Sequence, residues 1–236
     1  MMFRPFVVGC VAALGFSSPA IAATLSVNSI DGVWQNSSVS VSGQGTSEIR
    51  WGTPAYTFGS KSGYDFDASS DLTVEDGTSF VLGTFTHLNF PIRQGVLSSV
   101  DLSLSFLIDG VADAITTVFS FDHWETHNEA SVCANGAGQG EGVNNSYGCA
   151  DRVVATLNNA SSETFEIAGV TYALDITGFQ HEDELMTEFW TRENATNQAL
   201  LLGSFRVVPT EVPLPASGLL LLGGLAGLAM ARRRQK

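Results

Sequence analysis

The sequence predicts an all-β protein, built as an antiparallel β-sandwich with a jelly-roll-like topology. Three observations support this fold class. Short runs of alternating apolar and polar residues recur along the chain, Thr, Val and Phe are frequent in them, and Asp-Gly or Ala-Gly pairs separate several of the runs. Alternation with period two is typical of half-buried strands, and Asp-Gly is a favoured hairpin turn.

The predicted strands lie in the central part of the chain, and we expect eight or more. They cover residues 24–27, 37–42, 48–51, 80–85, 100–106, 117–121, 153–157 and 165–167. The predicted turns are Asp31-Gly32, Asp76-Gly77, Asp109-Gly110 and Ala168-Gly169. Only residues 181–194 form a segment long enough for a helix, but their apolar positions fit a bulged strand equally well.

A removable signal peptide is predicted at residues 1–23. Arg4 supplies a positive charge, residues 6–16 form an apolar run, and Ala20-Ile21-Ala22 has the small-x-small pattern of a cleavage site. The apolar run is too short to cross a bilayer core of about 30 Å as a helix. We therefore expect cleavage near residue 23 and a folded domain over residues 24–211.

The last 25 residues, 212–236, predict a hydrophobic sorting tail with a transmembrane helix. Its parts are the motif Val212-Pro213-Leu214-Pro215-Ala216, an apolar segment over 216–231, and the basic residues Arg232, Arg233 and Arg234. At about 1.5 Å per residue this apolar helix is marginally short for a complete span. The basic cluster predicts that this end of the chain lies in the cytoplasm. The alternative to a sorting tail is an ordinary C-terminal membrane anchor.

This tail resembles the VPLPA variant of the PEP-CTERM sorting signal of Gram-negative bacteria, although Pro213-Leu214-Pro215 replaces Pro-Glu-Pro. Thr86-His87-Leu88-Asn89 resembles the motif of the THxN family of PEP-CTERM proteins, with further similarity at residues 30–34, 125–128 and 148–151. The resemblance implies export across the inner membrane with processing by signal peptidase and exosortase. It also implies transient anchoring in that membrane, followed by display at the cell surface or release outside the cell.

Charge and cysteine content agree with export. Trimming both predicted processing segments leaves 6 basic and 24 acidic residues, a net charge of −18. Such a surface repels nucleic acids and anionic lipids and attracts divalent cations, so we expect no nucleic-acid partner. Cys10 lies in the predicted signal peptide, so the predicted domain keeps Cys133 and Cys149, an even pair bound for an oxidising compartment, which predicts a disulfide. A metal-thiolate site is the alternative, but it lacks a C-x-x-C spacing.

Two segments are candidate binding sites. The first is the motif of Thr86, His87 and Asn89; on a predicted strand His87 and Asn89 alternate with Thr86 and point to the same face, where they could share a ligand or brace a loop. The alternative is that they cap the end of the strand before Pro91. The second candidate is an acidic segment whose oxygen donors suit calcium; its predicted ligands are Asp122, Glu125, Asn128 and Asp151.

Alternatives also exist for this acidic segment. His123 and His127 would bind zinc if the segment were helical, but the preceding alternation indicates a strand. A solvated loop beside the disulfide would explain the same acidic residues without any metal.

The expected function is that of a non-enzymatic, exported surface or matrix protein associated with exopolysaccharide. The sequence contains no nucleophile elbow, P-loop or dinucleotide-binding fingerprint. One alternative is an extracellular glycan or ester hydrolase that uses Glu125 and Asp151 as paired carboxylates. Another is a structural envelope protein that self-associates.

Overall fold

The computed structural model describes residues 24–157 and 162–209 of the chain. The predicted signal peptide and the predicted sorting tail at 212–236 lie outside the described residues. Within the described part there is no helix long and apolar enough to cross a membrane.

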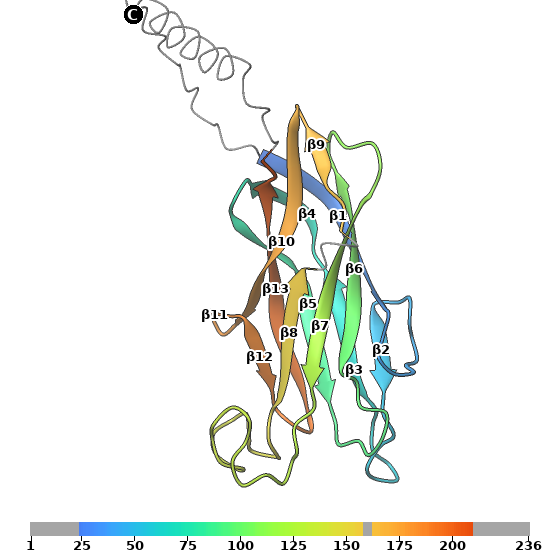
Figure 1. Cartoon of the computed structure of the whole chain (residues 1–236), viewed down its shortest axis with the longest axis vertical. Coiled ribbons are helices and arrows are strands. Elements are labelled where there is room, and N and C mark those ends of the chain that lie inside the picture. Colours follow the sequence, from blue (N-terminus) through green and yellow to red (C-terminus); the bar gives the residue numbers. More distant parts are fainter. Residues whose placement is uncertain (1–23, 158–161, 210–236) are drawn as a thin grey trace, which may run out of the picture.

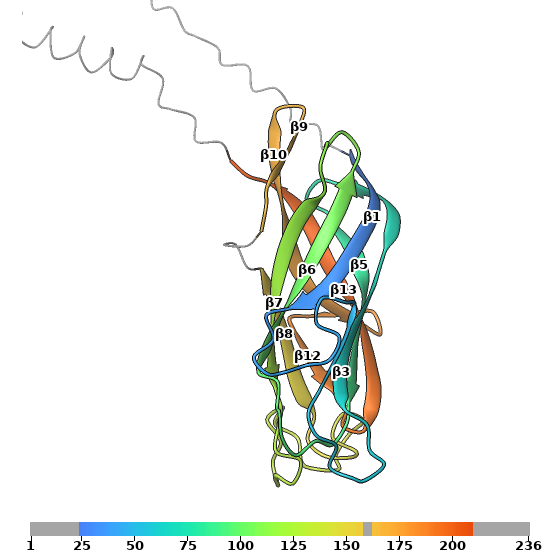
Figure 2. The same ribbon diagram turned by 90° about the vertical axis from the view of Figure 1, so that its right-hand side faces the viewer.

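Thirteen β-strands form two antiparallel sheets, which confirms the all-β class and is consistent with a β-sandwich (Figures 1 and 2). The first sheet has the order β12-β8-β7-β6-β1-β4, and the second has the order β11-β10-β13-β5-β3-β2, with β9 paired to β10. The strands of the first sheet are β1 (Thr24–Gln35), β4 (Ser70–Glu75), β6 (Ser99–Ile108), β7 (Ile115–Trp124), β8 (Asp151–Leu157) and β12 (Glu188–Thr191). The strands of the second sheet are β2 (Glu48–Trp51), β3 (Ser62–Ala68), β5 (Ser79–Asn89), β9 (Phe165–Ile167), β10 (Val170–His181), β11 (Glu184–Met186) and β13 (Ala195–Val207).

Strand β6 shows how sequence alternation produces this architecture. Its buried residues Val100, Leu102, Leu104, Phe106 and Ile108 occupy every second position, and the residues between them are more exposed. Successive strand side chains point to opposite faces, so one face of β6 enters the core and the other meets solvent. The predicted strand at 100–106 is therefore confirmed.

Aromatic side chains from both sheets fill the centre of the core. Trp34 of β1 and Phe121 of β7 come from the first sheet, and their ring centroids lie 5.0 Å apart. Tyr64 of β3 and Phe85 of β5 come from the second sheet, with centroids 4.9 Å apart. Tyr64 also lies 5.3 Å from Trp34, so the rings join the two sheets. The functional-site candidates lie next to this aromatic cluster.

Two local predictions were wrong. Asp31 and Gly32 lie inside β1, opposite Ser105 and Leu104, and form no turn. Glycine is needed here for packing, because a Cβ on Gly32 would collide with the ring of Phe66. Residues 37–42 contain no strand, and Ser42 alone makes an isolated bridge, to Arg50.

The other three predicted turns are confirmed between β4 and β5, β6 and β7, and β9 and β10. Residues 181–194 contain the short strands β11 and β12 rather than a helix. Strands β3, β4, β10 and β13 were not predicted. In β13, Leu201, Leu202 and Gly203 are consecutive buried residues, so strict alternation is lost where this strand lies between β10 and β5.

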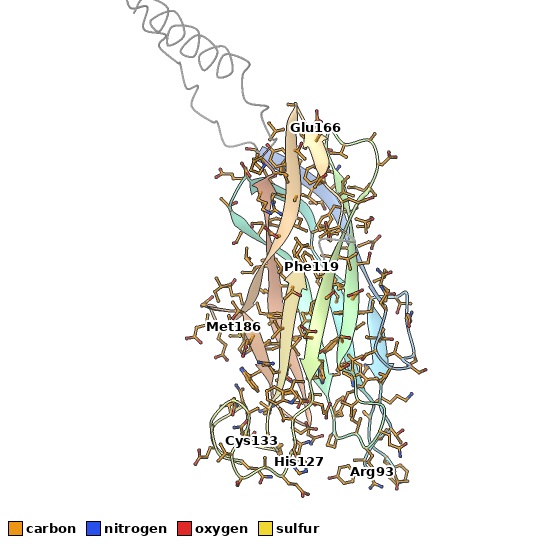
Figure 3. The ribbon with its side chains drawn as sticks, in the orientation of Figure 1. Arg93, Phe119, His127, Cys133, Glu166 and Met186 are labelled. Carbon is orange, nitrogen blue, oxygen red and sulfur yellow. A yellow bond between two sulfur atoms is a disulfide. The ribbon has the colours of Figure 1, made fainter. Side chains whose placement is uncertain are left out.

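A disulfide joins Cys133 and Cys149, as predicted, and closes the loop between β7 and β8. Figure 3 shows Cys133 near His127 at the lower end of the molecule. Asn145 also holds this loop, since its side chain exchanges hydrogen bonds of 3.0 Å with Asn135 and accepts one from the N–H of Ala150. The loop is therefore tied both covalently and by buried polar contacts.

We expect the double variant Cys133→Ser/Cys149→Ser to lower the free energy of unfolding by about 3 kcal/mol. The disulfide closes a loop and so reduces the conformational entropy of the unfolded chain, and the variant loses this effect. Urea denaturation of oxidised wild type and variant measures the difference. Reduced wild type should unfold at the midpoint of the variant. Equal midpoints for the oxidised wild type and the variant would contradict this prediction.

Candidate metal centre

A buried cluster of polar and ionisable side chains lies beside the aromatic core, at the end of the sandwich that carries the disulfide loop. Strand alternation places its histidines. In β5, Phe85, His87 and Asn89 are all fully buried, and in β7 Phe121 and His123 are two residues apart on the inward face. The imidazoles thus continue the rows of core aromatics. Asp151 begins β8, beside β7 in the first sheet.

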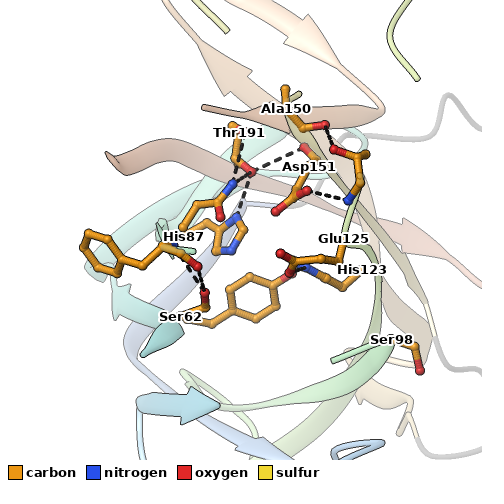
Figure 4. A network of polar contacts seen from close by, with 12 residues as sticks. Ser62, His87, Ser98, His123, Glu125, Ala150, Asp151 and Thr191 are labelled. Atoms are coloured by element: carbon orange, nitrogen blue, oxygen red, sulfur yellow. Dashed lines mark hydrogen bonds and ion pairs between the residues drawn. The ribbon is translucent and has the colours of Figure 1, made fainter. Parts of the chain in front are cut away.

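Each imidazole is oriented through its Nδ1 atom (Figure 4). Nδ1 of His87 lies 2.8 Å from Oγ1 of Thr191, and Nδ1 of His123 lies 2.5 Å from the hydroxyl of Tyr64. The Thr191 hydroxyl donates to the carbonyl of Asp151, so it accepts the proton of His87 Nδ1. This arrangement leaves an unprotonated lone pair on His87 Nε2, which is the nitrogen that metal ions bind when Nδ1 is a donor.

The interior also contains unsatisfied acceptors. Oδ1 of Asp151 accepts a hydrogen bond of 2.7 Å from the N–H of Thr126, but Oδ2 has no partner. His87 Nε2 and both carboxylate oxygens of Glu193 are likewise buried without a hydrogen bond. Buried polar atoms are nearly always paired, because an unpaired one costs about 1–3 kcal/mol. Several such atoms at one place make this cluster a candidate binding site.

The ligand atoms of these residues are close enough to share ions. One atom each from His87, His123 and Asp151 lie within 4.8 Å of one another, and the same holds for Glu125, Asp151 and Glu193. Nε2 of His123 lies 3.4 Å from Oε2 of Glu125. In a tetrahedral site with ligands at about 2.1 Å, two ligand atoms are about 3.4 Å apart, so side-chain movements of about an ångström would close either set.

The electrostatics favour a bound cation. Burial and the neighbouring charge of Glu125 raise the pKa of Asp151 to about 8. Burial raises the pKa of Glu125 to about 7, and burial with the charge of Glu125 raises that of Glu193 to about 7. Burial lowers the pKa of both His87 and His123, so both imidazoles are neutral at neutral pH. Neutral imidazole is the form that binds metals, whereas the carboxyl groups must release their protons to bind one, and a nearby cation favours that release.

No arginine or lysine balances these carboxyl groups among the described ion pairs. The arginine pairs are surface contacts of Arg50 with Glu48, Arg152 with Glu188, and Arg206 with Asp175. The donors of the cluster are mixed nitrogen and oxygen, which suits zinc and neighbouring divalent transition metals. Calcium takes oxygen ligands, so it suits the carboxylates alone.

A surface cleft connects the carboxylates with solvent. It has a volume of about 560 Å³, and its walls include Glu125, Asn128 and Glu193. The exposed rings of Tyr56 and Tyr147 also line it. The side chain of Glu125 is 14% exposed, whereas His87 is fully buried. Solvent therefore reaches the cluster from its carboxylate side.

Some of the residues predicted from the sequence meet here and others do not. His87 and Asn89 share the inward face, as their spacing predicts, and Asn89 donates to the carbonyl of Thr191. Thr86 instead accepts a hydrogen bond from Gln198.

The four predicted calcium ligands are also divided. Glu125, Asn128 and Asp151 lie at or beside the cluster, but Asp122 is exposed between inward-facing residues of β7. His123 joins the cluster from a strand, and exposed His127 does not.

Sequence reasoning missed Tyr64, Thr191 and Glu193. The period-two register of β3 contained a signal for Tyr64, because Tyr64 shares one face of the strand with buried Ser62 and Phe66. No local pattern distinguishes Glu193, which follows β12 and reaches the cluster only because β12 pairs with β8.

The fold and cluster together define an all-β, disulfide-bonded protein with a buried histidine and carboxylate centre. No protein-family model matches the chain, and no curated protein is significantly similar to it.

Proposed function

We propose that this chain is an exported, non-enzymatic surface or matrix protein that binds a divalent transition-metal ion, with zinc the best-suited ion. The ion is held by Nε2 of His87, Nε2 of His123 and a carboxylate oxygen of Asp151. We further propose that the two sheets form a jelly-roll-like sandwich, since the chain passes repeatedly from one sheet to the other.

The observation that carries the metal proposal is the pair of buried, unpaired acceptors His87 Nε2 and Asp151 Oδ2. A cation satisfies both atoms at once. The hydroxyls of Tyr64 and Thr191 support the same assignment, because metal-binding histidines generally use their second nitrogen in a hydrogen bond that orients the ring.

Export is supported by the sequence signals at both ends and by the disulfide, which suits an oxidising compartment. In this proposal, signal peptidase and exosortase process the chain at the inner membrane of a Gram-negative bacterium. The acidic domain then remains at the surface or in the matrix, associated with exopolysaccharide.

The test is a thermal melt of the purified protein in EDTA and then with excess zinc. An ion bound only to the native state stabilises it by about 4 kcal/mol at roughly 1,000 times Kd. The shift should be large at about pH 8 and much smaller at about pH 5.5, because at the lower pH protons occupy the carboxyl groups that the metal needs.

Two histidine variants provide the control. His87→Gln should lose the zinc-dependent shift, and His127→Gln, in the adjacent loop but outside the cluster, should keep it. The proposal would be overturned if, at about pH 8, zinc left the melting temperatures of wild type and His127→Gln unchanged.

A hydrolase is the second candidate function, and the environment of Glu125 favours it. Glu125 lines the cleft, its pKa is raised to about 7, and its Oε2 lies 3.4 Å from His123 Nε2. A carboxyl group with such a pKa suits general acid or base catalysis near neutral pH. Metal-dependent hydrolysis of a glycan or ester that is lost in Glu125→Gln would establish this function in place of the non-enzymatic one.

A further inference from the structure

We infer that the centre takes two metal ions bridged by Asp151, a buried ion on the histidine side and a second ion on the cleft side held by Glu125 and Glu193. This inference rests on the proposed metal-binding function and extends it. Its first support is the sharing of Asp151 between the two sets of converging ligand atoms.

Glu193 is the residue that one ion leaves unexplained. It is 1% exposed, and neither of its carboxylate oxygens makes a hydrogen bond of ordinary geometry, although the side chain of Asn128 and the backbone of Asn194 are close enough to lower its pKa. It converges with Glu125 and Asp151 but does not belong to the set formed by the two histidines. The side-chain oxygen of Asn128, also in the cleft wall, is a further buried acceptor without a partner. An ion at the histidine set alone would leave these acceptors unsatisfied.

Asp151 has the capacity to bridge. A carboxylate offers about four lone-pair sites, and the N–H of Thr126 uses one of them on Oδ1. Oδ2 is unpaired. In two-metal sites the ions lie about 3.5–4 Å apart, a spacing that one carboxylate spans. Figure 4 shows the side chains of His87, Asp151 and Glu125 converging on one region.

The two positions differ in chemistry. The histidine position offers two nitrogens and one oxygen, which suits zinc or cobalt. The cleft position offers oxygen ligands, which suits manganese, magnesium or calcium. Because Glu125 and Glu193 line the cleft, the second ion would keep coordination positions open toward it. That ion is therefore the one that meets water or an external ligand.

The experiment is a metal count on the full chain, purified in detergent, stripped with EDTA and loaded first with zinc or cobalt, then with manganese. We expect two ions per chain in the wild type. Glu193→Gln should retain the histidine-side ion and lose the cleft-side ion, with at least a 10-fold weaker second binding step. Glu129→Gln, an exposed residue of the same cleft, is the matched control and should still bind two.

Electron paramagnetic resonance supplies a second readout. Cobalt and manganese bridged by one carboxylate should give a spin-coupled signal, which Glu193→Gln abolishes and Glu129→Gln preserves. Circular dichroism checks that each variant is folded. One ion per chain with no effect of Glu193→Gln would overturn the two-ion inference and leave the proposed function standing. No bound ion in the wild type would overturn both.

Discussion

Trp34→Ala is expected to lower the free energy of unfolding by about 3–5 kcal/mol, which is the usual cost of removing a buried tryptophan side chain. Trp34 is fully buried, and its ring packs against Phe121 at 5.0 Å and Tyr64 at 5.3 Å between centroids. Its indole N–H donates to the carbonyl of Ser47 at 2.8 Å. Alanine would leave a cavity between the sheets and an unpaired carbonyl.

Urea denaturation followed by circular dichroism measures this loss, and Trp124→Ala is the matched control. Trp124 is 48% exposed, and its ring contacts the guanidinium of Arg152 at 5.0 Å. Truncation there should cost less than about 1 kcal/mol, the usual worth of an exposed cation–π contact. Similar losses for both tryptophans would show that the aromatic cluster is not the centre of stability.

Asp151→Asn is expected to weaken metal binding by more than about 100-fold, because even residues that only support a ligand contribute about 10–100-fold. It removes the carboxylate that both donor sets share. Isothermal titration with zinc measures this loss. Asp122→Asn is the control, since the Asp122 side chain is exposed on the outer face of the same sheet.

In EDTA the same variant should have the opposite effect on stability. The pKa of Asp151 is raised from 3.8 to about 8, so its protonated form stabilises the native state fully below about pH 4. That contribution is lost as the pH rises through about 8, where a buried carboxylate without a cation forms. Asparagine carries no such charge. The metal-free variant should therefore gain stability relative to wild type as the pH rises from about 4 to about 8, and should keep that gain at higher pH.

This combination separates a metal ligand from a structural residue. If Asp151 were purely structural, the Asp151→Asn variant would be less stable than wild type at every pH, and zinc would change the stability of neither protein. A metal ligand loses zinc binding and gains metal-free stability at high pH. A variant that is less stable than wild type in EDTA at about pH 9 would contradict the prediction.

The sequence by itself determined the fold class, because alternation is a local property of a strand with one buried face. The register of β5 shows this, since His87 and Asn89 could be assigned to one face before any pairing was known. The disulfide was also predictable from the sequence, because the two cysteines of the domain can form only one intramolecular bond. The turn predicted at Gly32 was wrong, because this glycine is needed to make room for Phe66 of the opposite sheet.

The tertiary structure alone decided which side chains form the centre. Glu193 follows β12, His87 lies on β5, and Asp151 begins β8, so the three come from distant parts of the chain. They meet because β12 pairs with β8 in one sheet while β5 faces them from the other. Pairing and stacking of strands depend on the packing of the whole core, which period-two patterns do not encode. Burial then leaves ordinary carboxyl and imidazole groups without hydrogen-bond partners, and burial is a property of the folded molecule.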